Sequence, residues 1–340
     1  MQRDERKLAL VTGGAGFIGS HLCDRLLAMG WRVRALDDLS VGRASNVAQH
    51  ADNPAFSLHV LDVADGAALA PLLDGCTRVF HLAALADIVP SIEAPLRYAH
   101  ANVTGTMTVL EAARAAGVQR FVYAASSSCY GIPDVYPTPE QAPCRPQYPY
   151  ALTKYLGEQA VLHWGQIYDL PVVSLRFFNV YGPRARTSGT YGAMFGVFLA
   201  QRLAGKPYTV VGDGTQSRDF TYVGDVVEAL VRAADSDVRG EVINVGTGKP
   251  VSVNEIVRIL GGPVVHVPKR PGEPDCTCAD TRRAQALLGF VAQVGIEQGI
   301  AQLLAHIDDW KDAPVWTPER IADATAAWFR HLGRNDDVAA

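Results

Sequence analysis

The stretch "LALVTGGAGFIGSHL" (8–22) limits the fold more than any other part of this sequence. An apolar run leads directly into a glycine-rich turn, and helical spacing begins within it. Glycines at a strand-to-helix transition let the backbone turn tightly and approach a pyrophosphate, whose charge is stabilised by the helix N-terminus. The stretch therefore predicts a dinucleotide site that is contacted by Gly13, Gly16, Phe17, Ile18 and Gly19.

Short apolar runs alternate with segments of helical spacing as far as about residue 178. The runs expected to form strands are 8–14, 32–37, 56–63, 78–84, 120–126 and 171–178. Near-continuous apolar strands separated by helices are typical of a parallel sheet that is covered on both faces. We therefore predict an α/β fold, with a Rossmann-type doubly wound parallel sheet over 1–178 that binds NAD and carries the catalytic residues.

After about residue 179 the pattern changes, because turns rich in Gly and Pro separate shorter elements. This change predicts a smaller mixed C-terminal lobe over 179–340 that mainly binds substrate. The lobe is expected to end in a helical extension, since "WTPERIADATAAWFRHLG" (316–333) offers Thr317 as N-cap and Pro318 at the first helical position.

Asp37 closes the second predicted strand, 18 residues after Gly19. An acid at this place accepts the hydroxyl groups of the adenosine ribose and repels a 2′-phosphate, which favours NAD over NADP. Arg43 lies nearby in the sequence and could pair with a 2′-phosphate, so NADP is not excluded as the cofactor. Further cofactor contacts are expected at other strand ends, from Asp62, Val63, Ala83 and Ala84.

Two of these strand-end positions allow another interpretation. Asp62 could instead be a helix N-cap, and we interpret His81 in "HLAALA" as a packed strand histidine rather than a functional one.

Charge and composition exclude several function classes. The net charge of −4 gives no basic surface for nucleic acid, and no apolar run approaches the roughly 20 residues that span a bilayer. The charged N-terminus runs straight into a strand, so we expect no signal peptide and a cytoplasmic protein. Of six cysteines only Cys276 and Cys278 are closely spaced, and no further ligand completes a zinc pattern, so no metal is predicted.

The segment "YPYALTKYLGEQA" places Tyr150 and Lys154 on one face of a predicted helix. A phenol titrates near 10 in water, and an adjacent ammonium and a positively charged nicotinamide would favour the phenolate. Ser126, 24 residues earlier, ends a predicted strand over the same cleft as the cofactor. These positions together predict acid–base chemistry beside NAD.

Seven ordered motifs carry a family resemblance: "TGGAGFIG", "HLAA", "SSSCYG", "YALTK", "RFFNVYGP", "GDGTQSRDF" and "RPGEP". Over roughly residues 7 to 305 the chain resembles the extended short-chain dehydrogenase/reductase family, and more narrowly its nucleotide-sugar 4-epimerases. The resemblance implies that Ser126, Tyr150 and Lys154 form the catalytic set. Tyr150 would take the proton of the sugar 4-hydroxyl, and C4 would give a hydride to a tightly bound NAD and receive it back on its other face.

The resemblance also implies the substrate contacts and the assembly. Arg218 and Arg270 would neutralise the pyrophosphate, and Glu273 would hold a ribose hydroxyl where the family more often has Asp. The remaining sugar or diphosphate contacts would come from Ser127, Ser128, Asn179 and Thr277. A homodimer would form through helices near 91–116 and 149–168.

Two features indicate the reaction and the sugar. Relatives that eliminate water or carbon dioxide carry an acid after the catalytic Ser or Thr, whereas this chain has Ser127 and Ser128, which favours oxidation and reduction without elimination. Thr277 occupies a position where the family resemblance implies that a small residue admits an N-acetyl group. We therefore expect UDP-GlcNAc/UDP-GalNAc, alongside UDP-Glc/UDP-Gal, as substrates.

Alternatives remain open at this stage. One is a 4,6-dehydratase or 4-oxidase acting on a UDP-, GDP-, CDP- or dTDP-sugar, and another is a non-catalytic NAD-binding protein, which the presence of all three catalytic residues disfavours. Two departures from the family pattern are Tyr148-Pro149, where Ser-Pro is usual, and the segment after about residue 308, which exceeds a minimal epimerase.

Overall fold

The computed structural model describes residues 7–185 and 193–333. A seven-stranded sheet lies at its centre, in the order β11-β6-β5-β4-β1-β2-β3, and each neighbouring pair is parallel. The strands are β1 (Leu8–Thr12), β2 (Arg32–Asp37), β3 (Phe56–Val60), β4 (Arg78–His81), β5 (Arg120–Ser126), β6 (Val172–Phe177) and β11 (Glu241–Val245). This arrangement confirms the predicted doubly wound α/β fold.

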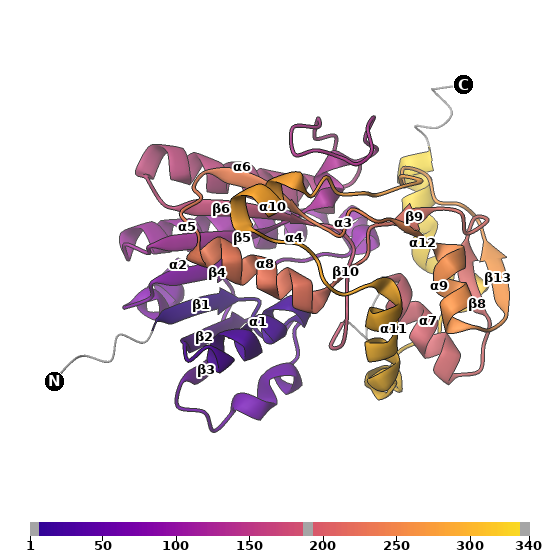
Figure 1. Cartoon of the computed structure of the whole chain (residues 1–340), viewed down its shortest axis with the longest axis horizontal. Coiled ribbons are helices and arrows are strands. Elements are labelled where there is room, and N and C mark those ends of the chain that lie inside the picture. The colour runs from indigo at the N-terminus through magenta and orange to yellow at the C-terminus, as the bar shows by residue number, and fades with distance from the viewer. Residues whose placement is uncertain (1–6, 186–192, 334–340) are drawn as a thin grey trace.

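Helices cover both faces of the sheet (Figure 1). On one face α1 (Phe17–Ala28), α8 (Val223–Asp235) and α10 (Arg282–Leu288) share an apolar core with the sheet. On the other face the core is formed with α2 (Gly66–Leu69), α5 (Gly105–Ala115) and α6 (Pro149–Tyr168). Two short helices, α3 (Ile88–Glu93) and α4 (Pro95–Ala99), connect β4 to α5.

The chain returns to the central sheet after the second lobe has begun. β11 pairs with β6, while α8 and α10 pack beneath it, although all three follow residue 178. The sequence did not identify β11 as a strand, because its five residues lie between turn-rich segments. A division of the chain at residue 178 stays a prediction.

The second lobe has its own core, which includes Phe198, Tyr208, Ile256 and Trp310. Its helices are α7 (Met194–Leu203), α9 (Val253–Leu260), α11 (Ile296–Ala305) and α12 (Pro318–Leu332). Short strand pairs complete it: β8 (Tyr208–Val211) with β13 (Val264–Val267), β9 (Ser217–Arg218) with β12 (Val251–Ser252), and β7 (Val180–Tyr181) with β10 (Thr221–Tyr222). Thr317 caps α12 by accepting a hydrogen bond from the Arg320 amide.

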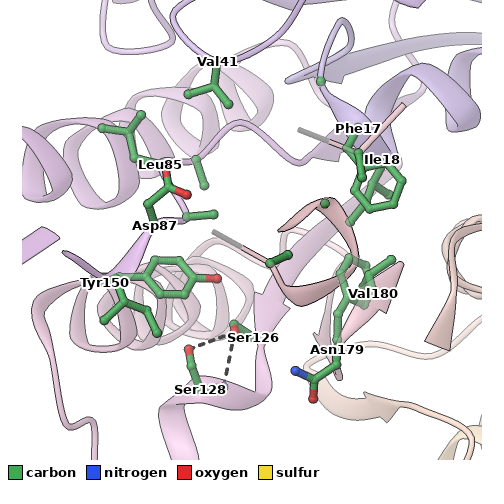
Figure 2. Close-up of a pocket in the computed structure, with 18 of the residues that line it drawn as sticks. Phe17, Ile18, Val41, Leu85, Asp87, Ser126, Ser128, Tyr150, Asn179 and Val180 are labelled. Carbon is green, nitrogen blue, oxygen red and sulfur yellow. Dashed lines mark hydrogen bonds between the residues drawn. The ribbon is translucent and has the colours of Figure 1, made fainter. Parts of the chain in front are cut away.

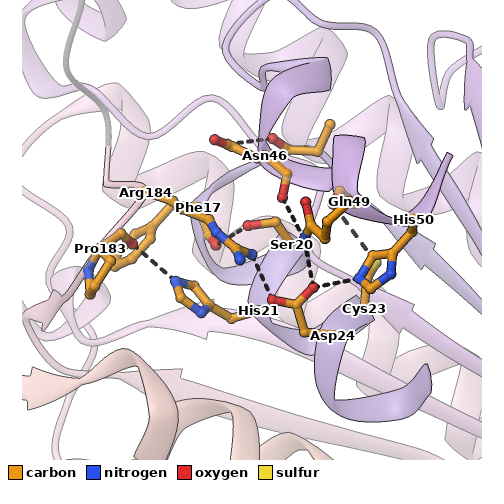
Figure 3. A network of polar contacts seen from close by, with 12 residues as sticks. Phe17, Ser20, His21, Cys23, Asp24, Asn46, Gln49, His50, Pro183 and Arg184 are labelled. Carbon is orange, nitrogen blue, oxygen red and sulfur yellow. Dashed lines mark hydrogen bonds and ion pairs between the residues drawn. The ribbon is translucent and has the colours of Figure 1, made fainter. Parts of the chain in front are cut away.

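A polar network centred on Asp24 fixes α1 to its surroundings (Figure 3). The Asp24 carboxylate lies 2.6 Å from His50 Nε2 and 2.8 Å from the Arg184 guanidinium. One turn earlier on α1, His21 contacts the Pro183 carbonyl oxygen at 3.0 Å. These contacts connect the middle of α1 to the segments that carry His50 and Arg184.

The described residues contain neither a membrane-spanning helix nor a cluster of metal ligands. None of the helices within 7–185 and 193–333 is long and apolar enough to cross a membrane. Over the same residues, no group of three or more His, Cys, Asp or Glu side chains could hold a metal ion.

Candidate active site

A cavity of about 790 Å³ opens where the carboxyl ends of the sheet strands meet the second lobe. Figure 2 shows it between Phe17 and Ile18 on one side and Tyr150 and Ser126 on the other. All predicted site residues except Lys154 line it: Gly13, Gly16, Phe17, Ile18, Gly19, Asp37, Asp62, Val63, Ala83, Ala84, Ser126, Ser127, Ser128, Tyr150, Asn179, Arg218, Arg270, Glu273 and Thr277. The fold therefore gathers residues that are distant in sequence at one edge of the sheet.

The glycine turn after β1 can pack tightly against its own chain and the β4 loop only because these positions lack side chains. Gly13 adopts a φ of +68°, and a Cβ there would lie 2.8 Å from the Ala83 amide nitrogen. At Gly19 a Cβ would collide with the Gly13 carbonyl oxygen. The turn thus brings the N-terminus of α1 to the cavity, which fits a dinucleotide pyrophosphate.

Asp37 ends β2 at the rim of the same cavity. Its Oδ2 accepts from the Ala15 amide at 3.0 Å and its Oδ1 accepts from the Leu39 amide at 2.9 Å. Burial raises the pKa of Asp37, while these backbone hydrogen bonds act in the opposite direction. A carboxylate fixed in this way fits the ribose of NAD and repels a 2′-phosphate. Arg43, by contrast, donates to Asn46 Oδ1 at 3.3 Å.

Asp62 occupies a place that the sequence did not anticipate. The third strand ends at Val60, so Asp62 lies in the following loop, and the N-cap of α2 is Asp65. Asp62 accepts a hydrogen bond from the Ala64 amide at 2.9 Å, and its carboxylate is 3.4 Å from His100 Nε2. Its side chain still borders the cavity, half exposed.

Ser126 is the last residue of β5 and caps the short 3₁₀ turn Ser127–Tyr130. Its Oγ accepts from the Ser128 amide at 3.2 Å and lies 2.8 Å from Ser128 Oγ (Figure 2). The two hydroxyls therefore act as one hydrogen-bonded unit at the cavity wall. Within this serine stretch, no side chain is acidic.

Tyr150 begins the first turn of α6 and points into the cavity (Figure 2). Burial raises the pKa of Tyr150, and hydrogen bonds from Ser126 and Ser128 oppose that rise. The nearby Asp87 charge raises the pKa further. Burial is the largest of these causes, because a phenolate away from water is strongly disfavoured.

Lys154 lies one turn along α6 from Tyr150, but it is only 5% exposed and does not border the cavity. Its Nζ lies 4.4 Å from the centroid of the Tyr123 ring. Burial lowers the pKa of Lys154 to about 7, and the Glu158 charge acts against that fall. Lys154 is therefore buried against Tyr123, outside the cavity lining.

His81 is a packed histidine, as interpreted from the sequence. It is fully buried between Thr12 Oγ1, 2.7 Å from Nδ1, and Thr106 Oγ1, 2.9 Å from Nε2. Burial lowers the pKa of His81 to about 3, so the ring is neutral over the ordinary pH range. Its contacts join β1, β4 and α5.

On the second lobe, Glu273 lies between two guanidinium groups. Arg270 Nη1 donates to Glu273 Oε1 at 3.2 Å, and Arg218 Nη2 lies 3.9 Å from Glu273 Oε2. Both arginine side chains are 14% exposed and line the cavity. Two cations and one anion leave a net positive charge there, which suits a diphosphate.

Thr277 and Asn179, which both line the cavity, are joined by a hydrogen bond. Thr277 Oγ1 donates to Asn179 Oδ1 at 2.8 Å and accepts from the Asp219 amide at 3.2 Å. The Thr277 side chain is thus held against the second lobe. Thr277 is a small residue that lines the cavity.

The cavity also contains residues to which the sequence gave no role: Asp87, Tyr148, Trp316 and Trp328. Asp87 follows β4, so its place after a parallel strand could have identified it. The motif departure at Tyr148 was visible, but its contacts were not. Nothing in the local sequence of α12 connects Trp328 to residues of α6.

The chain is similar to known proteins of one family over most of its length. Residues 9–246 match the family described as "NAD dependent epimerase/dehydratase family". The UDP-glucose 4-epimerase of Mycolicibacterium smegmatis is 40% identical over 302 residues, which are 86% of this chain and 96% of that protein.

Solved structures are similar over nearly their whole length. A UDP-N-acetylglucosamine 4-epimerase from Methanobrevibacter ruminantium has a TM-score of 0.85 and 31% identity, covering 89% of this chain and 98% of that one. A UDP-glucuronic acid 4-epimerase from Bacillus cereus, in complex with UDP-glucuronic acid and NAD, has a TM-score of 0.81 and 32% identity, covering 88% and 99%. These three relatives are named for three different UDP-sugars, so similarity alone does not select the sugar.

Proposed function

Because this chain belongs to the NAD-dependent epimerase/dehydratase family, we propose that it inverts C4 of a UDP-sugar through transient oxidation to a 4-keto sugar. The observation that carries the proposal is the meeting of Tyr150 and the Ser126–Ser128 pair with the cofactor glycines in one cavity. The acid–base group Tyr150 and the proposed NAD site then border the same cavity. Oxidation at C4 requires this, because the proton and the hydride leave the same part of the sugar.

Tyr150 is the proposed base for the sugar 4-hydroxyl. Ser126, hydrogen-bonded to Ser128, holds the same oxygen and stabilises the charge that develops on it. Bound NAD supplies the two-electron acceptor that oxidation at C4 needs. The flat 4-keto sugar then turns within the cavity and is reduced on its other face, while Tyr150 returns the proton to the 4-oxygen.

Arg218 and Arg270 are proposed to hold the diphosphate during this turn. Their guanidinium groups are fixed against Glu273 beside the cavity, so the phosphates can stay in place while the sugar rotates about its link to them. When the substrate binds, Glu273 would accept a hydrogen bond from a ribose hydroxyl and would give up one of its contacts with Arg218 or Arg270.

The proposed sugar is a UDP-N-acetylhexosamine, with UDP-Glc and UDP-Gal as further substrates. Thr277 supports this, because a small side chain, hydrogen-bonded to Asn179, stands at a cavity position where a large aromatic residue would restrict the pocket. The test is to incubate the NAD-loaded protein with UDP-GlcNAc, UDP-Glc and UDP-GlcA separately and to identify the products by NMR. Conversion of UDP-Glc without conversion of UDP-GlcNAc would contradict the role given to Thr277.

A Thr277→Tyr variant sharpens the test. A bulky ring there should abolish conversion of UDP-GlcNAc and leave conversion of UDP-Glc within about threefold, since only the larger substrate needs the space. An equal loss for both sugars would mean that position 277 does not select the sugar.

Asp87 favours a second candidate function, a 4,6-dehydratase. Its carboxylate lines the cavity and acts on the pKa of Tyr150, so it could supply the acid that the serine stretch lacks. An Asp87→Asn variant that still interconverts the C4 epimers, together with an unaltered protein that forms no 4-keto-6-deoxy product, would argue against it.

We also propose a homodimer. Leu152 and Leu156 of α6 are 46% and 42% exposed, and Leu96 of α4 is 84% exposed. Apolar side chains on neighbouring helices suit a second copy of the same face. A Leu152→Glu/Leu156→Glu variant should be monomeric by light scattering, whereas Leu287→Glu, an exposed leucine on α10, should stay dimeric.

A further inference from the structure

Trp328 is a cavity residue supplied by the last helix of the described chain. It lies on α12, beyond residue 305, where the family resemblance of the sequence ends. Only 3% of it is exposed, although it lines the cavity. Its indole Nε1 donates to the Pro271 carbonyl oxygen at 2.8 Å, so the indole is fixed to the chain directly after Arg270.

The same indole also contacts the Arg270 side chain. The guanidinium carbon of Arg270 lies 5.4 Å from the centroid of the Trp328 ring, within the range of a cation–π interaction. Near the end of α12, a Cβ built on Gly272 would be 3.9 Å from Leu332. The helix thus supports the turn of residues 270–273 at its backbone and at its arginine.

A third contact connects the indole to the catalytic helix. The Tyr148 ring centroid is 6.2 Å from that of Trp328, and Tyr148 in turn stacks on Tyr150. The segment that carries the indole is anchored as well, because Gln201 Nε2 donates to the Trp316 carbonyl oxygen at 2.7 Å. Trp328 therefore lies between the arginine and the proposed base.

We propose that Trp328 is a positioning residue for the nucleotide sugar, which holds Arg270 in the orientation that binds the diphosphate. This inference rests on the proposed function. A free arginine side chain loses rotamer freedom when it binds an anion, and an indole that already orders it removes part of that entropic cost. Loss of Trp328 should therefore weaken ground-state binding more than it slows the chemical step.

The test measures UDP affinity by isothermal titration calorimetry on the NAD-loaded protein. Trp328→Ala should weaken UDP binding about tenfold, because it removes both the ring face and the hydrogen bond. Trp328→Phe keeps a ring face and should weaken binding by only about threefold. The matched control is Phe329→Ala, the next residue on α12, which is 37% exposed and should bind UDP as the unaltered protein does.

A double-mutant cycle separates positioning from general damage to the fold. In an Arg270→Gln background, Trp328→Ala should change UDP affinity less than twofold, since the partner is already absent. With the sugar substrate, Trp328→Ala should raise KM about tenfold with kcat within about twofold. Unchanged UDP affinity in Trp328→Ala, or a full additive loss in the Arg270→Gln background, would overturn the inference.

Failure of a variant to fold and failure of the protein to bind UDP have different meanings. The thermal transition shows whether Trp328→Ala folds. If it does not fold, the inference would be overturned by a UDP affinity that stays unchanged in Trp328→Phe, both alone and in the Arg270→Gln background. An unaltered protein that fails to bind UDP would instead contradict the proposed function itself.

Discussion

Tyr148 lies flat against Tyr150, with the two ring planes 10° apart and their centroids 6.3 Å apart. We expect this stack to shield the proposed base from water on one side. Since burial raises the pKa of Tyr150, we expect the residue before Pro149 to influence the pH at which Tyr150 loses its proton and can act as a base. A position that departs from the usual Ser-Pro of the family thus contacts the proposed catalytic group.

Replacing Tyr148 should shift the pH dependence of the reaction. In Tyr148→Ser, water reaches Tyr150, the pKa of Tyr150 falls, and the acid limb of kcat/KM moves to lower pH. Tyr148→Phe keeps the ring and should leave the limb in place. The measurement is kcat/KM for epimerisation between pH 5.5 and 9.5; a limb at the same pH in Tyr148→Ser would show that the stack does not shield the base.

Replacing Lys154 should move the limb in the other direction. The protonated amine stabilises a nearby phenolate, so Lys154→Met should raise the pKa of Tyr150 and shift the acid limb to higher pH. We expect kcat at neutral pH to fall about 100-fold, in the range for loss of assistance to a general base. NAD content, measured after denaturing the purified variant, distinguishes this effect from loss of the cofactor. A limb that stays in place with NAD retained would assign Lys154 a purely structural role.

His81 should make the protein sensitive to acid. Its pKa is about 3 in the folded state, below its ordinary value, so only the unfolded chain binds a proton as the pH falls below about 6.5. The free energy of unfolding should decrease over that range, by up to ~1.4 kcal/mol per pH unit from this residue. Urea denaturation at pH 7 and pH 4.5 should show a smaller decrease for His81→Gln.

The control for that experiment is His163→Gln, which changes an exposed histidine on α6. It should keep the full pH dependence of the unaltered protein. An equal reduction in both variants would mean that the buried site between Thr12 and Thr106 is not the source of the effect.

The ion pair of Glu158 and Arg176 should be important for stability. Arg176 Nη2 lies 2.5 Å from Glu158 Oε1, both side chains are at most 5% exposed, and Ser174 Oγ donates to Glu158 Oε2 at 2.8 Å. Glu158→Gln leaves the buried arginine without its charged partner, which should cost about 3 kcal/mol or more in guanidinium denaturation. Glu255→Gln, which breaks an exposed pair with Arg258, should change stability little.

The fold could be predicted from sequence because the apolar runs have strand length and alternate with helical spacing. All six expected runs contribute a strand to the sheet, although the third ends at Val60 and the fourth at His81. Strand ends were placed too late because small and apolar residues continue into the loops. β11 was missed, since a five-residue run beside glycine turns gives little periodicity.

The sequence could predict those site residues whose place follows from the order of strands in the sheet. The carboxyl ends of parallel strands share one edge, so Gly13, Asp37 and Ser126 were expected together and are found together. Lys154 was expected at the cavity, but the packing of its amine on Tyr123 is a tertiary contact that helical spacing does not reveal. Trp328 depends on how α12 packs, which no local pattern encodes.

The central claim is that hydrogen leaves C4 of the sugar and returns to the same carbon. The most direct measurement is NMR of UDP-GlcNAc incubated with the NAD-loaded protein in D₂O. We predict conversion to the C4 epimer with no deuterium at C4 or C5, and no conversion by Tyr150→Phe. Deuterium at C4 or C5, or accumulation of a 4-keto-6-deoxy product, would contradict the account.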